Sequence, residues 1–156
     1  MSYRYANKND VDLILYFIKQ LAIYEKMENE VVATPEILEE WLFNKKIAEV
    51  IFAVEEEKDV GFALFFHNFS TFLGRGGIYL EDLFVLPEYR GKGHGKNLLK
   101  TLAEIAVERG CGRVEWCCLD WNKPSIDFYK SLGAVPMEDW IIYRLTGDSL
   151  KNMAKK

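Results

Sequence analysis

Three glycines at alternate positions, Gly91, Gly93 and Gly95, constrain this chain more than any other feature. They lie between a strand-like stretch that ends near Leu86 and an amphipathic run that Gly110 stops. The apolar residues of that run recur at helical spacing: Leu98, Leu99, Leu102, Ile105 and Ala106. Alternate glycines let backbone N–H groups point inward around an anion, and a helix that starts there adds free N–H groups and a positive dipole end. The pattern predicts an anion-binding turn between a strand and a helix.

Positive charge flanks this turn at Arg90 and Lys96, which makes a pyrophosphate the expected ligand. Two other phosphate loops do not match. A P-loop needs Ser or Thr after its Gly-Lys, but Asn97 follows Lys96. A dinucleotide-binding GxGxxG that starts at Gly91 would need glycine where Lys96 stands. The remaining alternative is a surface loop without a ligand, which the strand, the helix and the two cations disfavour.

The rest of the chain alternates segments of strand and helix character. We expect strands at residues 3–6, 49–55, 60–68, 77–86, 113–119 and 140–145. We expect helices at residues 11–22, 35–44, 95–109 and 123–132. The turn at residues 57–59 and the glycines near residue 75 make the middle three strands an antiparallel meander. The prediction is one domain over residues 1–156: an α/β fold whose mixed, mostly antiparallel sheet has helices on both faces.

Composition excludes few classes of protein, but it does limit the kinds of partner that we expect this chain to bind. A net charge of −4 and a pI near 5.3 argue against a nucleic-acid-binding domain. No apolar run reaches the ~18 residues that span a bilayer, and the N-terminus lacks a signal peptide, so we expect a cytoplasmic protein. Cys111, Cys117 and Cys118 lack the spacing of a metal site, and we expect them to be buried and reduced.

Two segments resemble the motifs of the GNAT superfamily, the Gcn5-related N-acetyltransferases. Residues 90–95 (RGKGHG) resemble its R/Q-x-x-G-x-G/A motif, and residues 122–134 (NKPSIDFYKSLGA) resemble its N-x-x-S/A-x-x-F/L-Y-x-x-x-G-A segment. Residues 79–85, 119–122 and 21–25 are similar to the diamine acetyltransferases, which include the spermidine/spermine and thialysine enzymes. This resemblance implies the GNAT acyl-CoA N-acyltransferase fold, an acetyl-CoA donor, a primary-amine acceptor and often a homodimer.

The resemblance also implies which residues bind the cofactor. The backbone of the strand before the turn would hold the pantetheine arm and the thioester carbonyl, and the turn would hold the pyrophosphate. By position the full set is Leu83, Phe84, Val85, Arg90, Gly91, Lys92, Gly93, His94, Gly95, Lys96, Asn122, Ser125 and Tyr129. We expect the His94 side chain to face solvent rather than to act as a base, and His67 to be an ordinary strand side chain.

Acetyl transfer to an amine needs a proton acceptor for the ammonium, whose pKa is near ~10.4, and a proton donor for the leaving thiolate. The resemblance assigns Glu81 to the amine, directly or through a water molecule, and Tyr129 to the sulfur. Asn122, Ile126 and Tyr129 share one helix face, so a capping Asn122 would aim the phenol toward the cofactor. Glu81 and Asp82 are adjacent in a strand, so we expect them to face opposite sides of the sheet.

Substrate recognition has the least support in the sequence. By resemblance the residues that contact the amine are Tyr24, Glu25, Glu81, Glu115, Trp116, Cys117 and Glu138, and no metal is expected. Residues 133–140 form a shorter segment than in the animal enzymes. Three alternatives stay open: acetylation of another small amine such as an amino acid or amino sugar, a non-catalytic acyl-CoA sensor, and an interaction module without a ligand.

Overall fold

The computed structural model describes all of residues 1–156, and the contacts divide the chain into two units, Met1–Cys117 and Cys118–Lys156. The first unit is built on a five-stranded sheet in the order β1-β2-β3-β4-β5. The strands are β1 (Ser2–Tyr5), β2 (Glu49–Glu55), β3 (Lys58–Ser70), β4 (Arg75–Val85) and β5 (Val114–Trp116). All neighbours are antiparallel except β4 and β5, which are parallel. The predicted meander and the mostly antiparallel sheet are confirmed.

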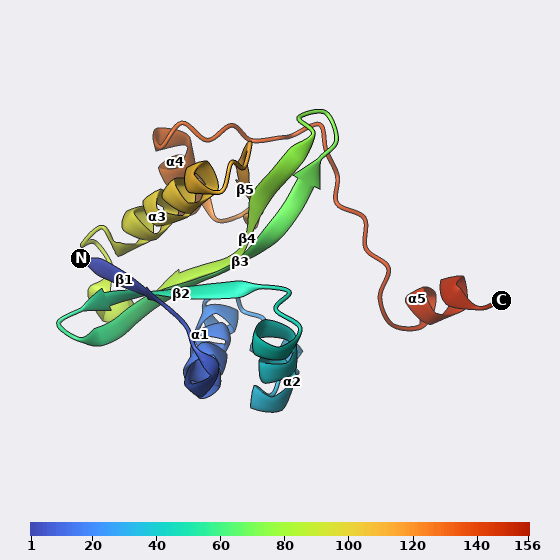
Figure 1. Ribbon diagram of the computed structural model, residues 1–156, viewed down its shortest axis with the longest axis horizontal. Coiled ribbons are helices and arrows are strands. Elements are labelled where there is room, and N and C mark those ends of the chain that lie inside the picture. The colour runs from blue at the N-terminus through green and yellow to red at the C-terminus, as the bar shows by residue number, and fades with distance from the viewer. The chain divides into compact units, whose positions relative to one another are not determined.

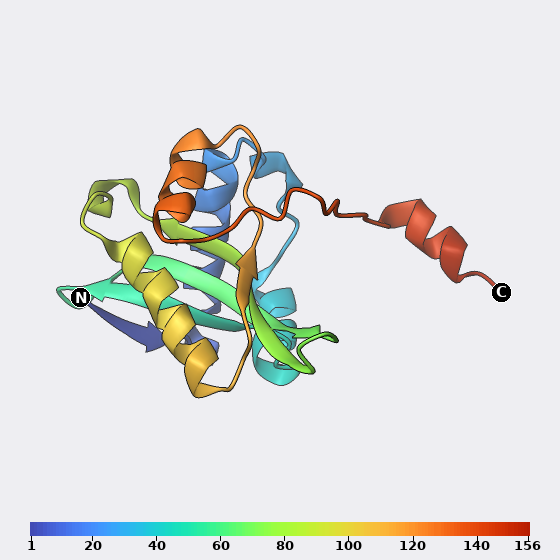
Figure 2. The ribbon, with the colours of Figure 1, turned by 90° about the horizontal axis from the view of Figure 1, so that it is seen from above.

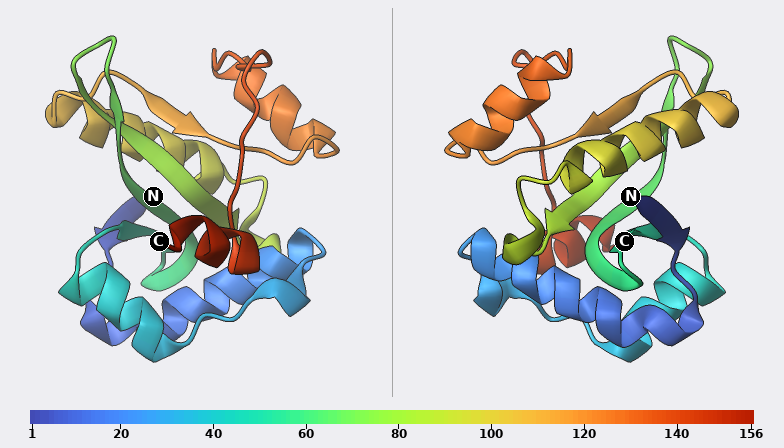
Figure 3. Two further views of the ribbon diagram at one scale, coloured as in Figure 1. Left: turned by 90° about the vertical axis from the view of Figure 1, so that its right-hand side faces the viewer. Right: turned by 90° about the vertical axis from the view of Figure 1, so that its left-hand side faces the viewer.

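Helices cover both faces of this sheet, as predicted (Figures 1 and 2). Helices α1 (Val11–Tyr24) and α2 (Pro35–Glu39) lie on one face, and α3 (His94–Glu108) lies on the other (Figure 3). Single turns of 3₁₀-helix, η1 (Lys8–Asp10), η2 (Glu28–Glu30) and η4 (Pro87–Tyr89), connect the elements, and a π-helical turn, η3 (Glu40–Asn44), extends α2. None of the helices combines the length and the apolar character that a membrane span requires.

The α1 face of the sheet carries a row of three phenylalanines. Phe52, Phe62 and Phe84 are register partners across β2, β3 and β4, and Phe17 of α1 stacks on Phe62 with ring centroids 5.2 Å apart. All four rings are at most 5% exposed. Because side chains alternate along a strand, Leu83 and Val85 of β4 face α3, where they lie beneath Gly95. Strand β4 is therefore packed on both faces just before the glycine turn.

Strand β4 contains a β-bulge at Glu81. Leu64 of β3 pairs with Asp82 and the next residue, Phe65, pairs with Leu80, so Glu81 has no partner. Leu64 packs against the α1-side core, which places Asp82 on the α1 face. Leu80 faces α3, so Glu81, the next residue, also points to the α1 face. The expectation that Glu81 and Asp82 face opposite sides is wrong, because the extra residue of the bulge resets the alternation.

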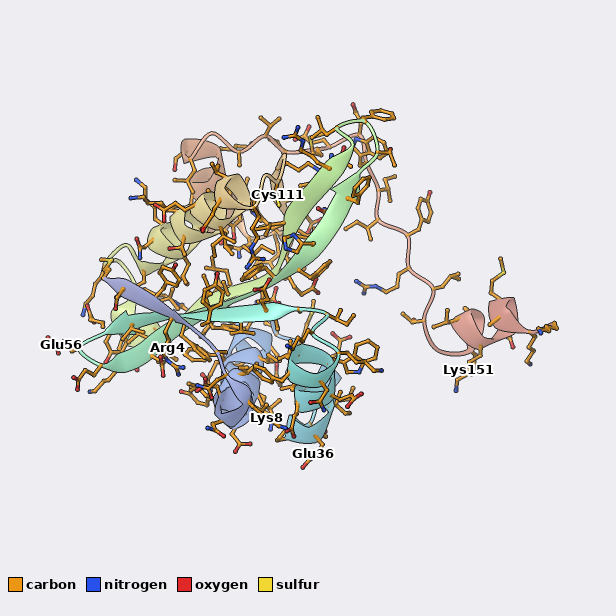
Figure 4. All side chains as sticks on the ribbon, viewed as in Figure 1. Arg4, Lys8, Glu36, Glu56, Cys111 and Lys151 are labelled. Carbon is orange, nitrogen blue, oxygen red and sulfur yellow. The ribbon has the colours of Figure 1, made fainter.

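The hairpin between β2 and β3 turns through two residues rather than three. Glu56 and Glu57 adopt left-handed φ angles of 48° and 66°, the geometry of a tight hairpin turn, and Glu56 lies at its tip (Figure 4). Lys58 and Asp59, which we assigned to the turn, belong to β3. Asp59 and Asp10 both bind the Arg4 guanidinium at 2.9 Å, which fixes β1 to the sheet and to the start of α1.

The second unit contains α4 (Lys123–Ser131) and α5 (Gly147–Ala154). Asn122 caps α4 as predicted, because its Oδ1 accepts a hydrogen bond from the Ser125 N–H at 3.4 Å. Gly133, at a φ of 89°, follows the end of the helix. Helix α5 was not predicted; it is a short polar helix with no buried residue.

Two strand predictions near the C-terminus need correction. Residues 140–145 form no strand, because no other segment of the chain pairs with them, and a strand exists only through its ladder of hydrogen bonds. Strand β5 spans three residues, not the predicted 113–119. Cys117 and Cys118 therefore lie outside it and are exposed rather than buried, although all three cysteines are free.

Candidate active site

The glycine turn leads from β4 through η4 into α3. Gly91 and Gly93 have left-handed φ angles of 78° and 90°, which other residues rarely adopt. Gly93 is the N-cap of α3, and no side chain caps the first N–H groups of the helix. A Cβ added at Gly91 would meet nothing within 4 Å, so open space lies beside this part of the turn. Free N–H groups and open space fit a bound phosphate.

The cations of the turn are held differently from one another. The Arg90 Nε donates to the Val85 carbonyl at 2.9 Å, and its guanidinium lies 5.1 Å from the Tyr24 ring and 5.0 Å from the Phe84 ring. Lys92 forms an ion pair with Glu55 at 3.2 Å, whereas Lys96 is exposed and forms no ion pair. Arg90 therefore braces the end of β4 against α1. Lys96 is available to a ligand at the turn, whereas Lys92 must first leave Glu55.

The His94 side chain is buried beneath the turn, so the prediction that it faces solvent is wrong. Its ring is 1% exposed, with Nε2 3.5 Å from the Glu55 carboxylate. Helical spacing explains the burial, since Leu98 and Leu102 lie one and two turns further along the same buried face of α3. Only the backbone of His94 remains suited to a phosphate.

Glu55, at the end of β2, is a residue that sequence reasoning missed. Its carboxylate contacts both Lys92 and His94 and so connects the β2–β3 hairpin to the turn. Desolvation raises the pKa of this carboxyl, but Lys92 and His94 outweigh that effect and leave the pKa below its usual value. No local motif marks Glu55, because the contact spans 37 positions of the sequence.

The backbone of Leu83, Phe84 and Val85 pairs with β3 but not with β5. Strand β5 pairs with β4 only at Ile78–Leu80, before the bulge, so from Glu81 onward the β5-side edge of β4 has no strand partner. An unpaired edge offers N–H and C=O groups to a ligand that lies along it. This is the arrangement that the cofactor assignment of residues 83–85 requires.

Carboxylates gather on the α1 face at the bulge. Glu81 is exposed, and Asp82 is partly buried and forms no hydrogen bond or ion pair. Burial and the charges of Glu81 and Glu25 raise the pKa of the Asp82 carboxyl to about 7. Glu25, the C-cap of α1, has its own pKa raised by desolvation. The structure thus places Glu25, Glu81 and Asp82 close enough to repel one another, with no internal cation to balance them.

The polar side chains on and near β5 are paired with one another, unlike the carboxylates at the bulge. Glu115 accepts from Arg113 at 2.9 Å and from Asn68 at 3.1 Å, so its charge is already compensated. The Tyr79 hydroxyl donates to the exposed Cys117 thiol at 2.9 Å. Desolvation, Cys117, Glu81 and Glu115 all raise the pKa of Tyr79, which keeps this phenol protonated. Tyr79 is a second site residue that sequence reasoning missed, although it lies two positions before Glu81 on the same strand.

Three further residues predicted to contact the amine are Trp116, Tyr24 and Glu138. Trp116 is half-buried in β5 opposite Leu80, and Tyr24 is exposed at the end of α1 with its ring 6.4 Å from that of Phe84. Glu138 lies exposed in a turn of the second unit.

The remaining predicted residues lie on α4 in the second unit. Asn122, Ser125 and Tyr129 follow one another at spacings of three and four, so they share one face of the helix. The Tyr129 ring is half-buried and lies 5.7 Å from that of Phe128. One face of the short helix α4 therefore carries both the capping amide of Asn122 and the phenol of Tyr129.

Residues 16–134 match the model of the acetyltransferase (GNAT) family, so the chain belongs to this family and is an acetyltransferase. It is 38% identical to the thialysine N-epsilon-acetyltransferase of Bos taurus, with 98% of this chain and 96% of that protein covered. It is 34% identical to an L-ornithine N5-acetyltransferase of Arabidopsis thaliana, over 97% of this chain and 87% of that protein. An integron cassette protein from the mobile metagenome of V. cholerae has a similar structure, with a TM-score of 0.83, 32% identity and coverage of 99% and 98% of the two chains.

Membership of the family implies acetyl-CoA as the co-substrate. The uncapped start of α3, the open space at Gly91 and the exposed cation of Lys96 fit its pyrophosphate.

Proposed function

We propose that this chain transfers the acetyl group of acetyl-CoA to a primary amine of a small polyamine or a thialysine- or lysine-like substrate. The observation that carries the proposal is the cluster of uncompensated carboxylates at the bulge, a few residues before the glycine turn on the same strand. Relatives that cover nearly the whole chain act on thialysine and ornithine by name, and both molecules carry a side-chain ammonium.

The turn and the edge of β4 bind the donor in this proposal. Acetyl-CoA supplies the acetyl group as a thioester. The N–H groups of Gly91, Gly93 and Gly95 and the charges of Lys92 and Lys96 hold the pyrophosphate. The unpaired edge at Leu83, Phe84 and Val85 holds the pantetheine arm, and a backbone N–H there polarises the thioester carbonyl.

Glu81 is the residue at the acceptor amine. An ammonium with a pKa near ~10.4 is almost entirely charged at neutral pH, so an exposed carboxylate attracts it before a proton can leave. Tyr24 and Glu25 at the end of α1 form the opposite wall. Trp116 and Cys117 contribute surface from the β5 side, and Glu115, already paired with Arg113, contributes shape more than charge.

In this proposal Tyr129 protonates the leaving thiolate, and Asn122 and Ser125, at the start of α4, bind the cofactor. Replacement of Tyr129 by Phe removes one hydroxyl and keeps the ring. We expect kcat to fall about tenfold or more while acetyl-CoA still binds. Measurement of kcat and of the acetyl-CoA dissociation constant on the same preparation tests this role, and an unchanged kcat would remove Tyr129 as the acid.

We further propose that the chain acts as a homodimer of single-domain subunits. Trp140, Ile141, Ile142 and Tyr143 are between 68% and 90% exposed, in a segment that sequence character marks as a strand. Such a segment gains hydrogen bonds and apolar burial from a second copy of the chain. The family match spans residues 16–134 and so includes parts of both units, which supports one domain.

A cytoplasmic setting is the natural one for this enzyme. Its three cysteines are free and two of them are exposed, a state that a reducing compartment maintains.

The experiment that tests the proposed function is thiol release from acetyl-CoA with a panel of amines: spermidine, spermine, putrescine, thialysine, lysine and aminoglycosides. We expect release with at least one aliphatic amine, and mass spectrometry of that product should show one added acetyl group. Release with the aminoglycosides alone would favour the amino-sugar alternative. Stabilisation by coenzyme A in a thermal shift assay, with no release for any amine, would favour the sensor.

A further inference from the structure

We propose that Asp82 takes up the proton that the acceptor ammonium loses, while Glu81 contacts and orients the amine. This inference rests on the amine acetyl transfer proposed above. Sequence analysis assigned to Glu81 alone both the contact with the amine and the uptake of its proton. This inference assigns the two tasks to two residues.

The bulge brings the two carboxylates together. In a regular strand Asp82 would point to the α3 face, where Leu83 and Val85 now point. The extra residue at position 81 instead turns Asp82 toward the α1 face, beside Glu81. A proton on an amine held by Glu81 is then within reach of Asp82, directly or across one water molecule.

The surroundings of the two carboxylates differ in a way that suits the two tasks. Asp82 is partly buried among apolar side chains, with Leu64 opposite it and Phe84 two positions along the strand. Glu81 is exposed. A solvated carboxylate attracts a cation well but is a weak base, whereas a partly buried carboxylate near like charges holds a proton near neutral pH.

The charged groups that face Asp82 are all acidic. They are Glu81 on its own strand and Glu25 at the end of α1. No lysine or arginine forms an ion pair with it. The guanidinium of Arg90 lies over the rings of Tyr24 and Phe84 and donates its Nε to the Val85 carbonyl, and Lys92 pairs with Glu55. The carboxylate therefore lacks any internal cation that would hold it ionised at low pH, and an incoming ammonium is the cation that fits.

One N–H bond of the ammonium breaks, its proton passes to a carboxylate oxygen of Asp82, and the electron pair stays on nitrogen. That pair forms the new N–C bond to the thioester carbonyl carbon as the C–S bond breaks. The sulfur takes a proton from Tyr129 as it leaves. A second nitrogen proton leaves the amide as it forms and, passed through water, restores the phenol of Tyr129. Asp82 releases its proton to water after turnover.

The test is the pH profile of kcat/KM for the acceptor amine in the wild type and in Asp82→Asn. In the wild type the profile should rise with pH to a break near pH 7 and then stay flat. In the variant the enzyme depends on amine that is already neutral, so the break should move toward the pKa of the amine at ~10.4. The variant should be about a hundredfold slower at pH 7.5 and approach the wild type near pH 10.

Three controls separate this role from others. Asp82→Glu should restore a break within the neutral range. Glu81→Gln should raise KM for the amine and move the break below pH 7, because it removes one of the charges that raise the pKa of Asp82, whereas Asp82→Asn moves the break in the opposite direction. Asp12→Asn, an exposed aspartate on α1, should change neither property.

The inference is overturned if Asp82→Asn keeps the wild-type break, or if it lowers kcat/KM by one factor at every pH, which indicates a structural role. Failure of the proposed function has a different signature, because the wild type itself would then release no thiol with any amine.

Discussion

Strand β4 carries opposite charges at its bulge and at the turn that follows it. At the bulge, Glu81 and Asp82 face Glu25 with no cation among them. At the turn, Arg90, Lys92 and Lys96 surround the start of α3. Few residues separate these two regions: the end of β4 and the turn η4 connect them.

The two regions also differ in how their charge is compensated. At the turn, Arg90 binds the Val85 carbonyl and two aromatic rings, and Glu55 neutralises Lys92. At the bulge, the negative charges have no cation to balance them, and burial together with repulsion from Glu81 and Glu25 raises the pKa of Asp82 to about 7. A compensated site is organised before its ligand arrives, whereas an uncompensated site favours a ligand of opposite charge. The comparison indicates that the donor site is preformed and that the acceptor site selects for a cation.

The largest effect is expected from Gly93→Val at the turn. A φ of 90° is strained for a β-branched residue, and the side chain would disturb the start of α3. We expect acetyl-CoA affinity to fall about a hundredfold or more, measured by calorimetry. Gly74→Val is the matched control, because Gly74 also has a left-handed φ, of 69°, but lies in the loop between β3 and β4. An equal loss in both variants would show that unfolding, not the anion site, is responsible.

The next largest effect is expected from Glu81→Gln at the bulge. Loss of one charged hydrogen bond to the ammonium should raise KM for the amine by about ten- to a hundredfold, while acetyl-CoA affinity stays unchanged. Steady-state kinetics with each substrate varied in turn measures this. Glu88→Gln removes an exposed charge in η4, nearer to the turn, and should leave KM for the amine unchanged. Similar KM increases in both variants would mean that only the overall negative charge attracts the amine.

Asp82→Asn should stabilise the fold even as it slows the reaction. The folded pKa of about 7 lies above the ~3.9 of an unfolded aspartate, so the unfolded state binds fewer protons between these values. Wild-type stability must therefore fall as pH rises from about 4 to about 7, and the asparagine variant escapes this loss. We expect a gain of about 1–2 kcal/mol in the free energy of unfolding at pH 8, after allowance for partial exposure, and little near pH 4. Urea denaturation at both pH values measures it, and a loss of stability at pH 8 would contradict the repulsion described here.

The smallest effect distinguishes the two lysines of the turn. Lys96 has no partner to leave, whereas Lys92 must exchange Glu55 for the phosphate. Lys96→Ala should weaken acetyl-CoA binding several-fold, by more than Lys92→Ala does, and the difference should shrink as salt rises. Calorimetry at low and high ionic strength tests the ranking, and a larger effect at Lys92 would reverse it.

The sequence predicts the features that depend on neighbouring residues. Short-range backbone chemistry determines the turn with alternate glycines, the Asn122 cap and the β2–β3–β4 meander. The residue types that produce these features are directly visible in the sequence. The burial of His94 could also have been predicted from the sequence, because His94 continues the helical spacing of Leu98 and Leu102.

The sequence does not predict features that depend on distant pairing. The bulge at Glu81 is a property of the register between β3 and β4, since either strand alone reads as regular. The contacts of Glu55 with the turn are long-range for the same reason. Residues 140–145 have strand character but no partner within the chain, so their composition alone was misleading.

The central claim is that the acidic region of β4 selects a cationic acceptor for a donor held at its glycine turn. The most direct test compares thiol release from acetyl-CoA with an aliphatic diamine and with the amino alcohol of equal length, in the wild type and in Glu25→Gln. The account predicts that the wild type prefers the diamine in kcat/KM by about tenfold or more, and that the variant loses much of this preference. Equal rates for the two acceptors in the wild type would contradict it.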